Sequence, residues 1–422
     1  MTWKRVPLAD LADIQGGIQK QPKRAPRNNS FPFLRVANVT AKGLDLSDVH
    51  AIELFGDELP RLRLRRGDLL VVEGNGSASQ IGRAAVWDGS IADCVHQNHL
   101  IRVRAREGLL PRYLGLLWNS PAVREELTSV SSSSSGLHTL SVAKLKRLVL
   151  PVPPIGEQQR IVEILEDHLS RLDAANSSVA RARRRGDVLV KAILTDLIPD
   201  VERYPGDWVR STVGLAGRIG LGRQRHPDWH TGPNMRPYLK VANVFEDRID
   251  TSVLMEMHWP DDTFERFRLR PGDILLNEGQ TPDLLGRPAL YRGSPPEVAF
   301  TNSLIRFVAG TSVLPEFALL VFRRHMHAGR FKRESRITTN IAHLSAARLK
   351  DVEFPIPPIE EQRRIIDVAS QRLDAVKALS AHAGIVERRS GVMRRAVLAA
   401  AFEGKLTGRH TDAEMIEELT DV

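Results

Sequence analysis

One stretch of this chain occurs twice, and it constrains the possible fold more than any other feature. Residues 150–161 and 354–365 both read Pro-x-Pro-Pro-x-x-Glu-Gln-x-x-Ile after one apolar residue. Proline fixes φ and lacks an amide donor, so the motif suits the end of a strand or the first turn of a helix. The glutamate lies where a helix dipole favours negative charge. Each copy therefore predicts a strand end that leads directly into a helix.

The duplication extends well beyond this motif. Other segments recur in the same order, with an offset of 205 residues early in the repeat and 204 later. They are residues 33–39 and 238–244, 66–70 and 271–275, 81–87 and 285–291, and 98–102 and 302–306. Two copies at so long a period indicate a tandem duplication rather than a solenoid.

Each copy begins with a mixed domain. Residues 68–72 and 99–103 have the pattern of strands, whereas residues 111–118 and 315–324 look helical, with a proline at or near the first turn. The predicted fold class is therefore α+β, with two tandem mixed α/β domains separated by two long helices. The predicted parts are a first mixed domain at 1–152, a central helical spacer at 153–200, a second mixed domain at 201–356, a C-terminal helical spacer at 357–404 and a tail at 405–422.

A long helix is predicted after each motif, over about 157–197 and about 361–402. Apolar or small residues recur in both helices at heptad-like spacing, which predicts that the two helices pack as an antiparallel coiled coil. About 40 residues would give a rod of roughly 60 Å. The predicted seam residues are Leu165, Leu172 and Val179 in the first helix, and Val376, Leu379, Ala383, Val386, Met393, Val397 and Ala400 in the second.

Arginine gathers outside these seams. One interpretation is a solvated helix face, and the other is a surface that meets a protein partner or DNA phosphates. The residues concerned are Arg181, Arg183, Arg184, Arg185, Arg388, Arg389, Arg394 and Arg395.

Composition narrows the class of protein. The chain has 42% hydrophobic and 26% charged residues, which is typical of a soluble globular protein, and it has no apolar run long enough to span a bilayer. The first residues lack the apolar core of a signal peptide. A single cysteine, Cys94, excludes an internal disulfide and favours a reducing, cytoplasmic location. The formal net charge of +9 points toward a polyanionic partner such as nucleic acid.

The sequence contains no recognisable catalytic motif. The glycines at Gly74 and Gly76 lack the third glycine and the helix of a dinucleotide-binding loop, and no phosphate-binding loop ends in Lys-Ser or Lys-Thr. Cys94 is predicted to be a buried thiol rather than a nucleophile. His325 and His327 are two residues apart on a predicted helix, so they do not share a face as metal ligands would. The sequence therefore predicts no catalytic residue, no metal site and no cofactor.

The doubled motif, with a long helix after it and a mixed domain before it, resembles the specificity subunit of Type I restriction-modification systems. The Gly-Asp-Leu or Gly-Asp-Ile runs at Gly67 and Gly272, and the Gly-Arg pairs at Gly82 and Gly286, are similar to family features within the recognition domains. The resemblance covers nearly the whole chain, to about residue 404.

The resemblance implies that each mixed domain is a target recognition domain that reads one half of a split, asymmetric sequence in double-stranded DNA. The paired helices would be the spacer and would dock methyltransferase subunits, two of them, with restriction and translocase subunits joining through the complex. The assembled complex would be an adenine-N6 methyltransferase and endonuclease, and this chain its non-catalytic subunit. Two rigidly spaced readers suit a bipartite site, so the helix length is expected to set the number of unspecified bases.

Candidate DNA contacts follow from the chemistry of base readout. Asn and Gln pair with adenine, Arg pairs with guanine, and Ser and Thr hydroxyls serve bases or phosphates. Loops rich in these residues at matching places in the two copies are the candidates. In the first copy they are Gln19, Lys20, Asn75, Ser77, Ser79, Gln80, Arg83, Gln97 and His99. In the second copy they are Arg223, Gln224, Arg225, Gln280, Thr281, Arg287, Thr301, Ser303, Arg336, Thr338 and Asn340.

Comparison of the two copies separates these candidates. Arg83 and Arg287 are the same residue in both, which favours a phosphate contact or a role in the fold. Asn75 and Gln280 differ at matching places, which favours sequence discrimination. The serine run at 131–135 has two interpretations, a DNA contact and a linker.

Two other function classes stay open at this point. One is a self-contained DNA methyltransferase or nuclease, which a methylation assay on the isolated chain would reveal. The other is a two-headed coiled-coil adaptor that binds proteins only. Salt-sensitive retention of DNA by the chain together with a methyltransferase partner would exclude the adaptor.

Overall fold

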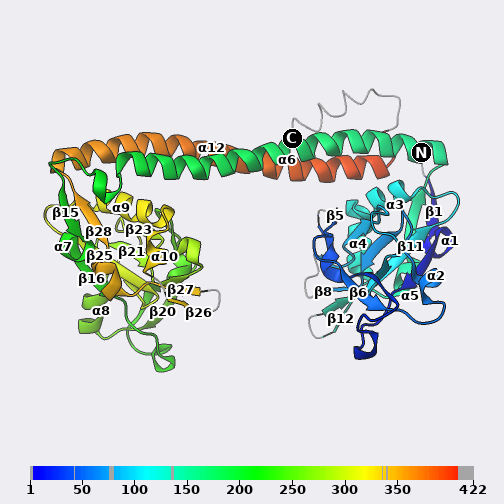
Figure 1. Ribbon diagram of the computed structural model, residues 1–422, viewed down its shortest axis with the longest axis horizontal. Helices are drawn as coiled ribbons and strands as arrows, with labels where there is room; N and C mark the ends of the chain where they lie inside the picture. The colour runs from blue at the N-terminus through cyan, green and yellow to red at the C-terminus, as the bar shows by residue number, and fades with distance from the viewer. Residues whose placement is uncertain are drawn as a thin grey trace. The chain divides into compact units, whose positions relative to one another are not determined.

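A computed structural model describes residues 3–41, 43–75, 80–134, 137–334, 336–338 and 341–406 (Figure 1). The chain divides into two compact units, each of which contains parts of both long helices. Unit 1 comprises residues 1–179 and 385–422, and unit 2 comprises residues 180–384. The tail predicted at 405–422 lies almost wholly outside the described residues.

An antiparallel four-stranded sheet forms the centre of each unit. Its middle strands are buried on both faces, because apolar clusters pack against each side of the sheet. In unit 1 the strand order is β2 (Ala12–Gly16), β11 (Leu100–Ala105), β7 (Leu69–Val72), β9 (Ala84–Val86). In unit 2 the order is β16 (Gly217–Leu221), β25 (Leu304–Ala309), β21 (Ile274–Asn277), β23 (Pro288–Leu290).

Smaller sheets surround the central sheet and repeat between the units. Each unit has a three-stranded sheet with one parallel pair, a three-stranded antiparallel sheet and a short hairpin. In unit 1 these are β10 (Val95–His96), β3 (Ser30–Leu34) and β6 (His50–Glu53); β12 (Ser132–Ser134), β13 (Leu137–Thr139) and β8 (Gly74–Asn75); and β4 (Val39–Thr40) with β5 (Gly43–Leu44). In unit 2 they are β24 (Ala299–Phe300), β17 (Met235–Leu239) and β20 (Met255–His258); β22 (Gly279–Gln280), β27 (Ile341–His343) and β26 (Arg336–Thr338); and β18 (Val244–Phe245) with β19 (Arg248–Ile249).

Short helices cover the sheets, and the two predicted from sequence are present. In unit 1 the helices are α1 (Leu8–Leu11), α2 (Glu58–Leu62), α3 (Pro111–Trp118), α4 (Pro121–Val130) and α5 (Val142–Arg147). In unit 2 they are α7 (Val213–Ala216), α8 (Asp261–Phe267), α9 (Pro315–His327), α10 (Arg330–Arg333) and α11 (Ala346–Lys350). The helices α3 and α9 begin at a proline, which has no amide hydrogen to leave unpaired at the first helical position.

The doubled motif has the same structure in both units. The strand β14 (Val149–Val152) pairs with β1 (Lys4–Pro7), and β28 (Glu353–Ile356) pairs with β15 (Val209–Thr212). The helices α6 (Ile155–Leu197) and α12 (Ile359–Phe402) begin three residues after these strands end. The predicted transition from strand end to helix is therefore confirmed at both copies.

The glutamine of the motif is fully buried in each unit and fixes the start of the long helix. In unit 1 the Gln158 side chain donates to the carbonyl oxygens of Gly108 and Pro153, both at 2.9 Å, and accepts from the Leu110 amide at 2.8 Å. These contacts tie three segments together: the loop before α3, the proline turn and the first turn of α6. We call this the glutamine clamp.

The clamp recurs in unit 2 with the same three contacts. Gln362 donates to the carbonyl oxygens of Ser312 and Pro357, at 2.8 and 2.9 Å, and accepts from the Leu314 amide at 2.8 Å. Buried amide groups need such partners, because an unpaired one costs about 1–3 kcal/mol. The repeated motif therefore encodes a hydrogen-bonded joint in addition to its prolines.

The helices α6 and α12 pack against each other, as predicted. In unit 1 the core contains Leu165 of α6 and Val397 of α12, and Asp173 pairs with Arg394. In unit 2 the core contains Leu194 of α6, together with Leu373 and Val376 of α12. Arg372 donates to Asp196 at 2.8 Å in the same unit. Asp173 of α6 pairs with Arg394 of α12, whereas Asp196, later in α6, pairs with Arg372, earlier in α12. The two helices are therefore antiparallel.

The predicted seam of α12 was partly wrong. Leu379 and Val386 are exposed, with half and 43% of their surfaces accessible. The buried face of this part of α12 instead follows Ile365, Ala369, Leu373, Val376 and Ala383, with spacings of three, four and seven. Packing against the mixed domain and α6 together widens the buried face of the helix beyond a simple heptad seam.

Candidate nucleic-acid interface

The register of the central sheet in unit 1 brings the ends of its four strands together. Gly16 pairs with Ile101, Val72 with Leu100, and Ala84 with Val71. The strands β2 and β7 therefore end where β11 and β9 begin. We call this edge, with the segments attached to it, the loop end of unit 1.

Backbone hydrogen bonds connect the predicted contact segments at this loop end. The Ile18 amide donates to His96 O at 2.8 Å, and the Asn98 amide donates to Ile18 O at 2.9 Å. The Glu73 amide donates to His99 O at 3.0 Å. In addition, β8 pairs with β13, so the segment after β7 lies beside the β12–β13 hairpin. Segments that are far apart in the sequence thus form one surface region.

Unit 2 repeats this arrangement. Leu304 pairs with Asn277, and the Asn302 amide donates to Arg223 O at 3.0 Å. The Glu278 amide donates to Ser303 O at 3.0 Å. The strand β22 pairs with β27, which places Gln280 beside the β26–β27 hairpin. The loop end of unit 2 is therefore built from the same set of segments.

Several predicted contact residues are available at the surface. In unit 1 Gln19, Lys20 and His99 are exposed, and Gln80 and Gln97 are half-buried. In unit 2 Gln224, Arg225 and Thr281 are exposed, and Gln280 is half-buried and accepts from the Thr281 amide at 3.0 Å. These side chains carry the donors and acceptors that base and phosphate contacts use.

Other predicted contacts are occupied within unit 2, which sequence reasoning did not foresee. Thr301 is fully buried, and its hydroxyl donates to Leu239 O at 3.2 Å. The Ser303 hydroxyl accepts from the Val241 amide at 3.1 Å. Arg223 lies over the ring of Trp229, with its guanidinium carbon 3.7 Å from the ring centroid. The two hydroxyls join the segment after β24 to the end of β17, and Arg223 packs on the 3-10 turn over Pro227–Trp229.

Arg83 and Arg287 are half-buried at matching places just before β9 and β23. Arg83 donates to Gln80 Oε1 at 3.2 Å, whereas the Arg287 guanidinium lies 4.7 Å from the centre of the Phe245 ring. Burial lowers the pKa of Arg287 from its ordinary value. Both side chains thus contact neighbouring residues of their own unit.

The remaining predicted contacts lie outside the described residues or side chains. Ser77, Ser79 and Asn340 are outside the described residues. Asn75, Arg336 and Thr338 are described only as positions in β8 and β26. The serine run contributes the strand β12, so part of it belongs to a hairpin rather than to a linker.

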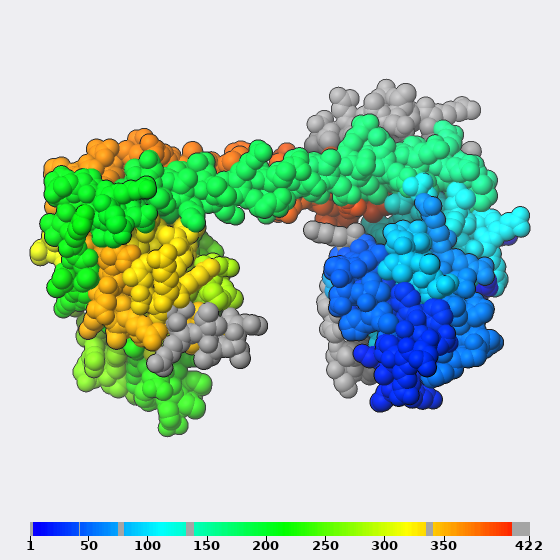
Figure 2. All heavy atoms as spheres, viewed as in Figure 1, coloured from blue at the N-terminus to red at the C-terminus, as the bar shows by residue number. Residues whose placement is uncertain are grey.

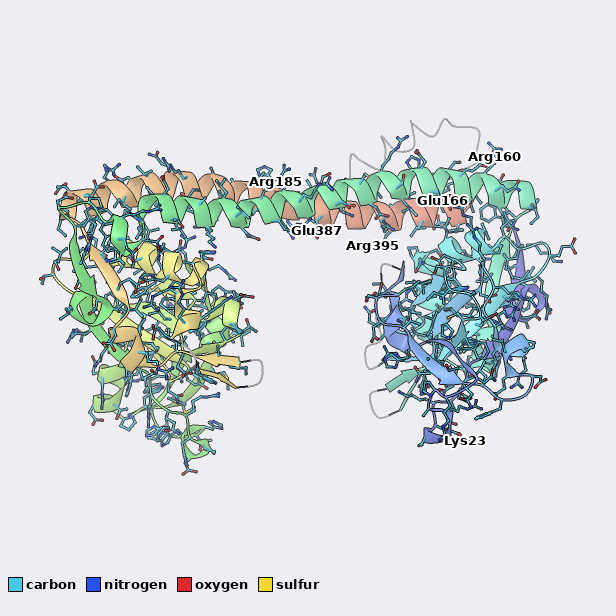
Figure 3. All side chains as sticks on the ribbon, in the orientation of Figure 1. Lys23, Arg160, Glu166, Arg185, Glu387 and Arg395 are labelled. Atoms are coloured by element: carbon cyan, nitrogen blue, oxygen red, sulfur yellow. The ribbon has the colours of Figure 1, made fainter. Side chains whose placement is uncertain are left out.

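Two exposed side chains next to the predicted contact segments were not among the sequence predictions. Lys23, in a single 3-10 turn over Pro22–Arg24, follows the Gln19–Lys20 segment and is exposed. It lies on the side of unit 1 away from the long helices (Figure 3). In Figure 2, the dark-blue atoms on this side of unit 1 are those of the first residues of the chain. His343 of unit 2 was also not predicted. The sequence feature that points to it is the glutamate shared by the two copies, Glu73 and Glu278, because His343 contacts Glu278.

The buried titratable groups do not resemble a catalytic set. Burial raises the pKa of the Cys94 thiol to about 12 and lowers the pKa of His96 to about 4. His325 is also buried, its pKa is lowered to about 4, and it bonds to Glu353 O at 2.9 Å. Among the described residues, no group of three or more His, Cys, Asp or Glu side chains could hold a metal ion. None of the described helices is long and apolar enough to cross a bilayer.

Comparison with known proteins identifies the family. A family model described as the Type I restriction modification DNA specificity domain matches residues 1–178 and 263–381, which together are more than half of the chain. The chain belongs to this family. Its two-part match agrees with the duplicated loop ends and long helices.

Curated relatives are specificity subunits as well. The chain is 30% identical over 189 residues to the Type I restriction enzyme EcoKI specificity subunit of Escherichia coli (strain K12). That alignment spans 44% of this chain and 39% of the relative, well under two thirds of the relative's length. The match to the Type I restriction enzyme EcoBI specificity subunit of Escherichia coli is 22% identical and covers 97% of this chain and 87% of that subunit.

Solved structures share the fold of the specificity family. A chain from a structure concerned with complex assembly and conformational transition of the type I R-M system aligns with a TM-score of 0.73 at 18% identity, covering 96% of this chain and 98% of that one. The HsdS subunit from Thermoanaerobacter tengcongensis aligns with a TM-score of 0.51 at 19% identity, covering 96% and 97% of the two chains. The predicted α+β class with an antiparallel helix pair is confirmed.

Proposed function

We propose that this chain is the DNA-recognition subunit of a Type I restriction-modification complex and that each loop end reads one half of a bipartite, asymmetric DNA target. The observation that carries the proposal is the duplicated loop end. Segments rich in base-reading side chains meet at the same edge of the same sheet in both units. We further propose recognition-domain limits of 1–152 and 201–356, which the β1–β14 and β15–β28 pairings support because each joins the two ends of one domain.

The long helices are the proposed docking surface for two methyltransferase subunits. Both helices expose large apolar side chains, whose contact with water is unfavourable. They are Val188 and Leu189 of α6 and Leu379 of α12 in unit 2, and Ile385 and Val392 of α12 in unit 1. Exposed apolar side chains close together on a surface mark sites that another molecule covers. Restriction and translocase subunits would join through that complex. The chemistry would then belong to the other subunits, and this chain would act on cellular DNA in the cytoplasm without being an enzyme.

A reconstituted complex tests the proposal. The chain and its methyltransferase partner are expressed together in a host that lacks DNA methylation, and the host genome is sequenced for N6-methyladenine. We expect methylation at one split, asymmetric sequence that requires both proteins. Methylation by the isolated chain would favour a self-contained methyltransferase. A complex that forms but neither binds DNA nor directs methylation would favour a protein-only adaptor.

A further inference from the structure

A glutamate holds the loop end together in unit 1. The amide of Glu73 donates to His99 O at 3.0 Å, and its carbonyl oxygen accepts from the Leu140 amide at 2.7 Å. The residue thereby connects the turn before β11 with the segment after β13. Its side chain accepts a further hydrogen bond from the same turn, because His99 Nδ1 lies 3.1 Å from Glu73 Oε2.

Unit 2 contains the same glutamate with a histidine from a different segment. Glu278 has the matching backbone contacts, to Ser303 O at 3.0 Å and from the Leu344 amide at 2.8 Å. Its carboxylate lies 3.3 Å from Nδ1 of His343, which is in β27 rather than in the turn before β25. The ring of His343 lies against Gly279, where an added Cβ would be 3.2 Å from the ring.

The two histidines do not occupy equivalent positions in the repeat. Ser303 stands in unit 2 where His99 stands in unit 1, and its hydroxyl is occupied by the Val241 amide. The register that pairs Gly279 with His343 pairs Gly74 with Thr139 in unit 1. Both loop ends therefore contain a glutamate–imidazole pair, but the histidine comes from a different segment in each unit.

Stability gives little reason for this recurrence. The His99 and Glu73 side chains are 57% and 32% exposed, and those of His343 and Glu278 are 47% and 27% exposed. Pairs with such exposure contribute little to folding, because water screens the attraction between the side chains. The pair is therefore better explained by what it presents to solvent than by what it adds to the fold.

The carboxylate determines which imidazole nitrogen is presented. A carboxylate only accepts hydrogen bonds, so Nδ1 of each ring carries the proton that it donates to the glutamate. Nε2 is then left for a ligand, and no described residue forms a hydrogen bond with Nε2 of His99 or His343. Nε2 accepts a hydrogen bond in the neutral ring and donates one in the cation.

We propose that His99 and His343 each read one adenine in the major groove, with Glu73 and Glu278 as positioning residues. This inference rests on the proposed function. Adenine offers both an N6 amino donor and an N7 acceptor at its major-groove edge, whereas guanine and thymine offer only acceptors and cytosine only a donor. Adenine is therefore the base that satisfies Nε2 in either protonation state.

The test uses the complex of this chain with its methyltransferase and sequencing of methylated adenines in a host genome. His99→Ala should make one A·T position degenerate in one half-site only, with methylation of sequences altered there rising about 10-fold or more relative to the target. His343→Ala should do the same in the other half-site. His99→Gln should restore much of the preference, because glutamine also pairs with adenine. His50→Ala is the matched control, since His50 of β6 pairs with Asp48 at 3.5 Å in the same unit.

The positioning role has its own readout. Glu73→Ala should relax the same A·T position as His99→Ala and should add nothing in the double variant. An unchanged target sequence, a uniform loss at all sequences, or relaxation at a G·C position would overturn the inference. If the unaltered complex directs no methylation at a bipartite sequence, the proposed function itself has failed, and this outcome is distinct because it precedes any substitution.

Discussion

At the scale of single residues, Asn277 differs in polarity from its counterpart in the other copy. It is fully buried at the end of β21, and neither its Oδ1 nor its Nδ2 has a partner among the described protein atoms. The matching position in unit 1 is Val72, which is buried among apolar residues. A buried polar group without a partner costs about 1–3 kcal/mol.

Asn277→Val should therefore stabilise the chain by about 1–2 kcal/mol. The reciprocal change Val72→Asn should destabilise it by a similar amount or more, because it places an amide in an apolar cluster. Urea unfolding followed by circular dichroism measures both. Equal stability of Asn277→Val and the unaltered chain would mean that the amide is satisfied by buried water.

Glu246 provides a pH-dependent prediction at the same scale. Burial alone would raise the pKa of this carboxyl, but His327 and Arg323 outweigh burial and lower the pKa to about 2. His327 Nε2 lies 2.9 Å from Glu246 Oε1, and Arg323 Nε donates to the same oxygen at 2.7 Å. Because the pKa is lower in the folded state, the glutamate adds stability above its unfolded pKa and loses it as pH falls.

Glu246→Gln should therefore cost about 1–3 kcal/mol at neutral pH, and this difference should shrink as pH falls from about 5 toward 2. The free energy of unfolding of both chains across that range measures the effect. A difference that stays constant with pH would show that the carboxylate charge contributes nothing.

At the scale of elements, the glutamine clamp determines how a long helix leaves its recognition domain. Gln158→Leu would leave three backbone groups in partly or fully buried surroundings without partners, so we expect a loss of about 2–4 kcal/mol. Gln159, the next residue, is exposed, and Gln159→Leu should change stability by less than about 0.5 kcal/mol. Thermal or urea unfolding of the two variants compares them directly. Similar effects of both substitutions would contradict the clamp.

The length of the two helices is the second prediction at this scale. We propose that the helix pair sets the distance between the half-sites. Inserting one heptad into each helix keeps the packing faces in register and adds about 10 Å. The methylated sequence should then have about three more unspecified base pairs, given about 3.4 Å per base pair. An active complex with unchanged spacing would exclude the helices as a ruler.

At the scale of the whole molecule, a formal net charge of +9 predicts strong dependence on salt. A complex with about 6–10 phosphate contacts should lose about 10³–10⁵ in affinity between 50 and 200 mM salt. Lys20→Ala at the loop end should weaken binding to target and non-target DNA equally and lower the salt slope by about one. Lys191→Ala on the exposed face of α6 is the control, and fluorescence anisotropy with labelled duplexes is the measurement.

The architecture of this protein could be predicted from its residues alone. Proline chemistry fixed the two strand-to-helix transitions within a few residues, because proline restricts its own backbone wherever it stands. The repeat showed two equivalent halves, and the apolar spacing of α6 and α12 predicted an antiparallel pair. It also named the segments that form both loop ends, because Asn, Gln, Arg and Ser gathered at matching places.

Which of the described side chains have partners within the protein depends on contacts that form on folding. Thr301 and Ser303 had the right chemistry for DNA, but their hydroxyls bond to the backbone of Leu239 and Val241, 62 residues earlier in the chain. Leu379 and Val386 had heptad spacing, yet both face solvent, because the buried face of α12 follows other positions. His343 acquired its glutamate only because β22 pairs with β27. Spacing along a chain records what a backbone can do locally, whereas hydrogen-bond partners and burial depend on segments that meet only after folding.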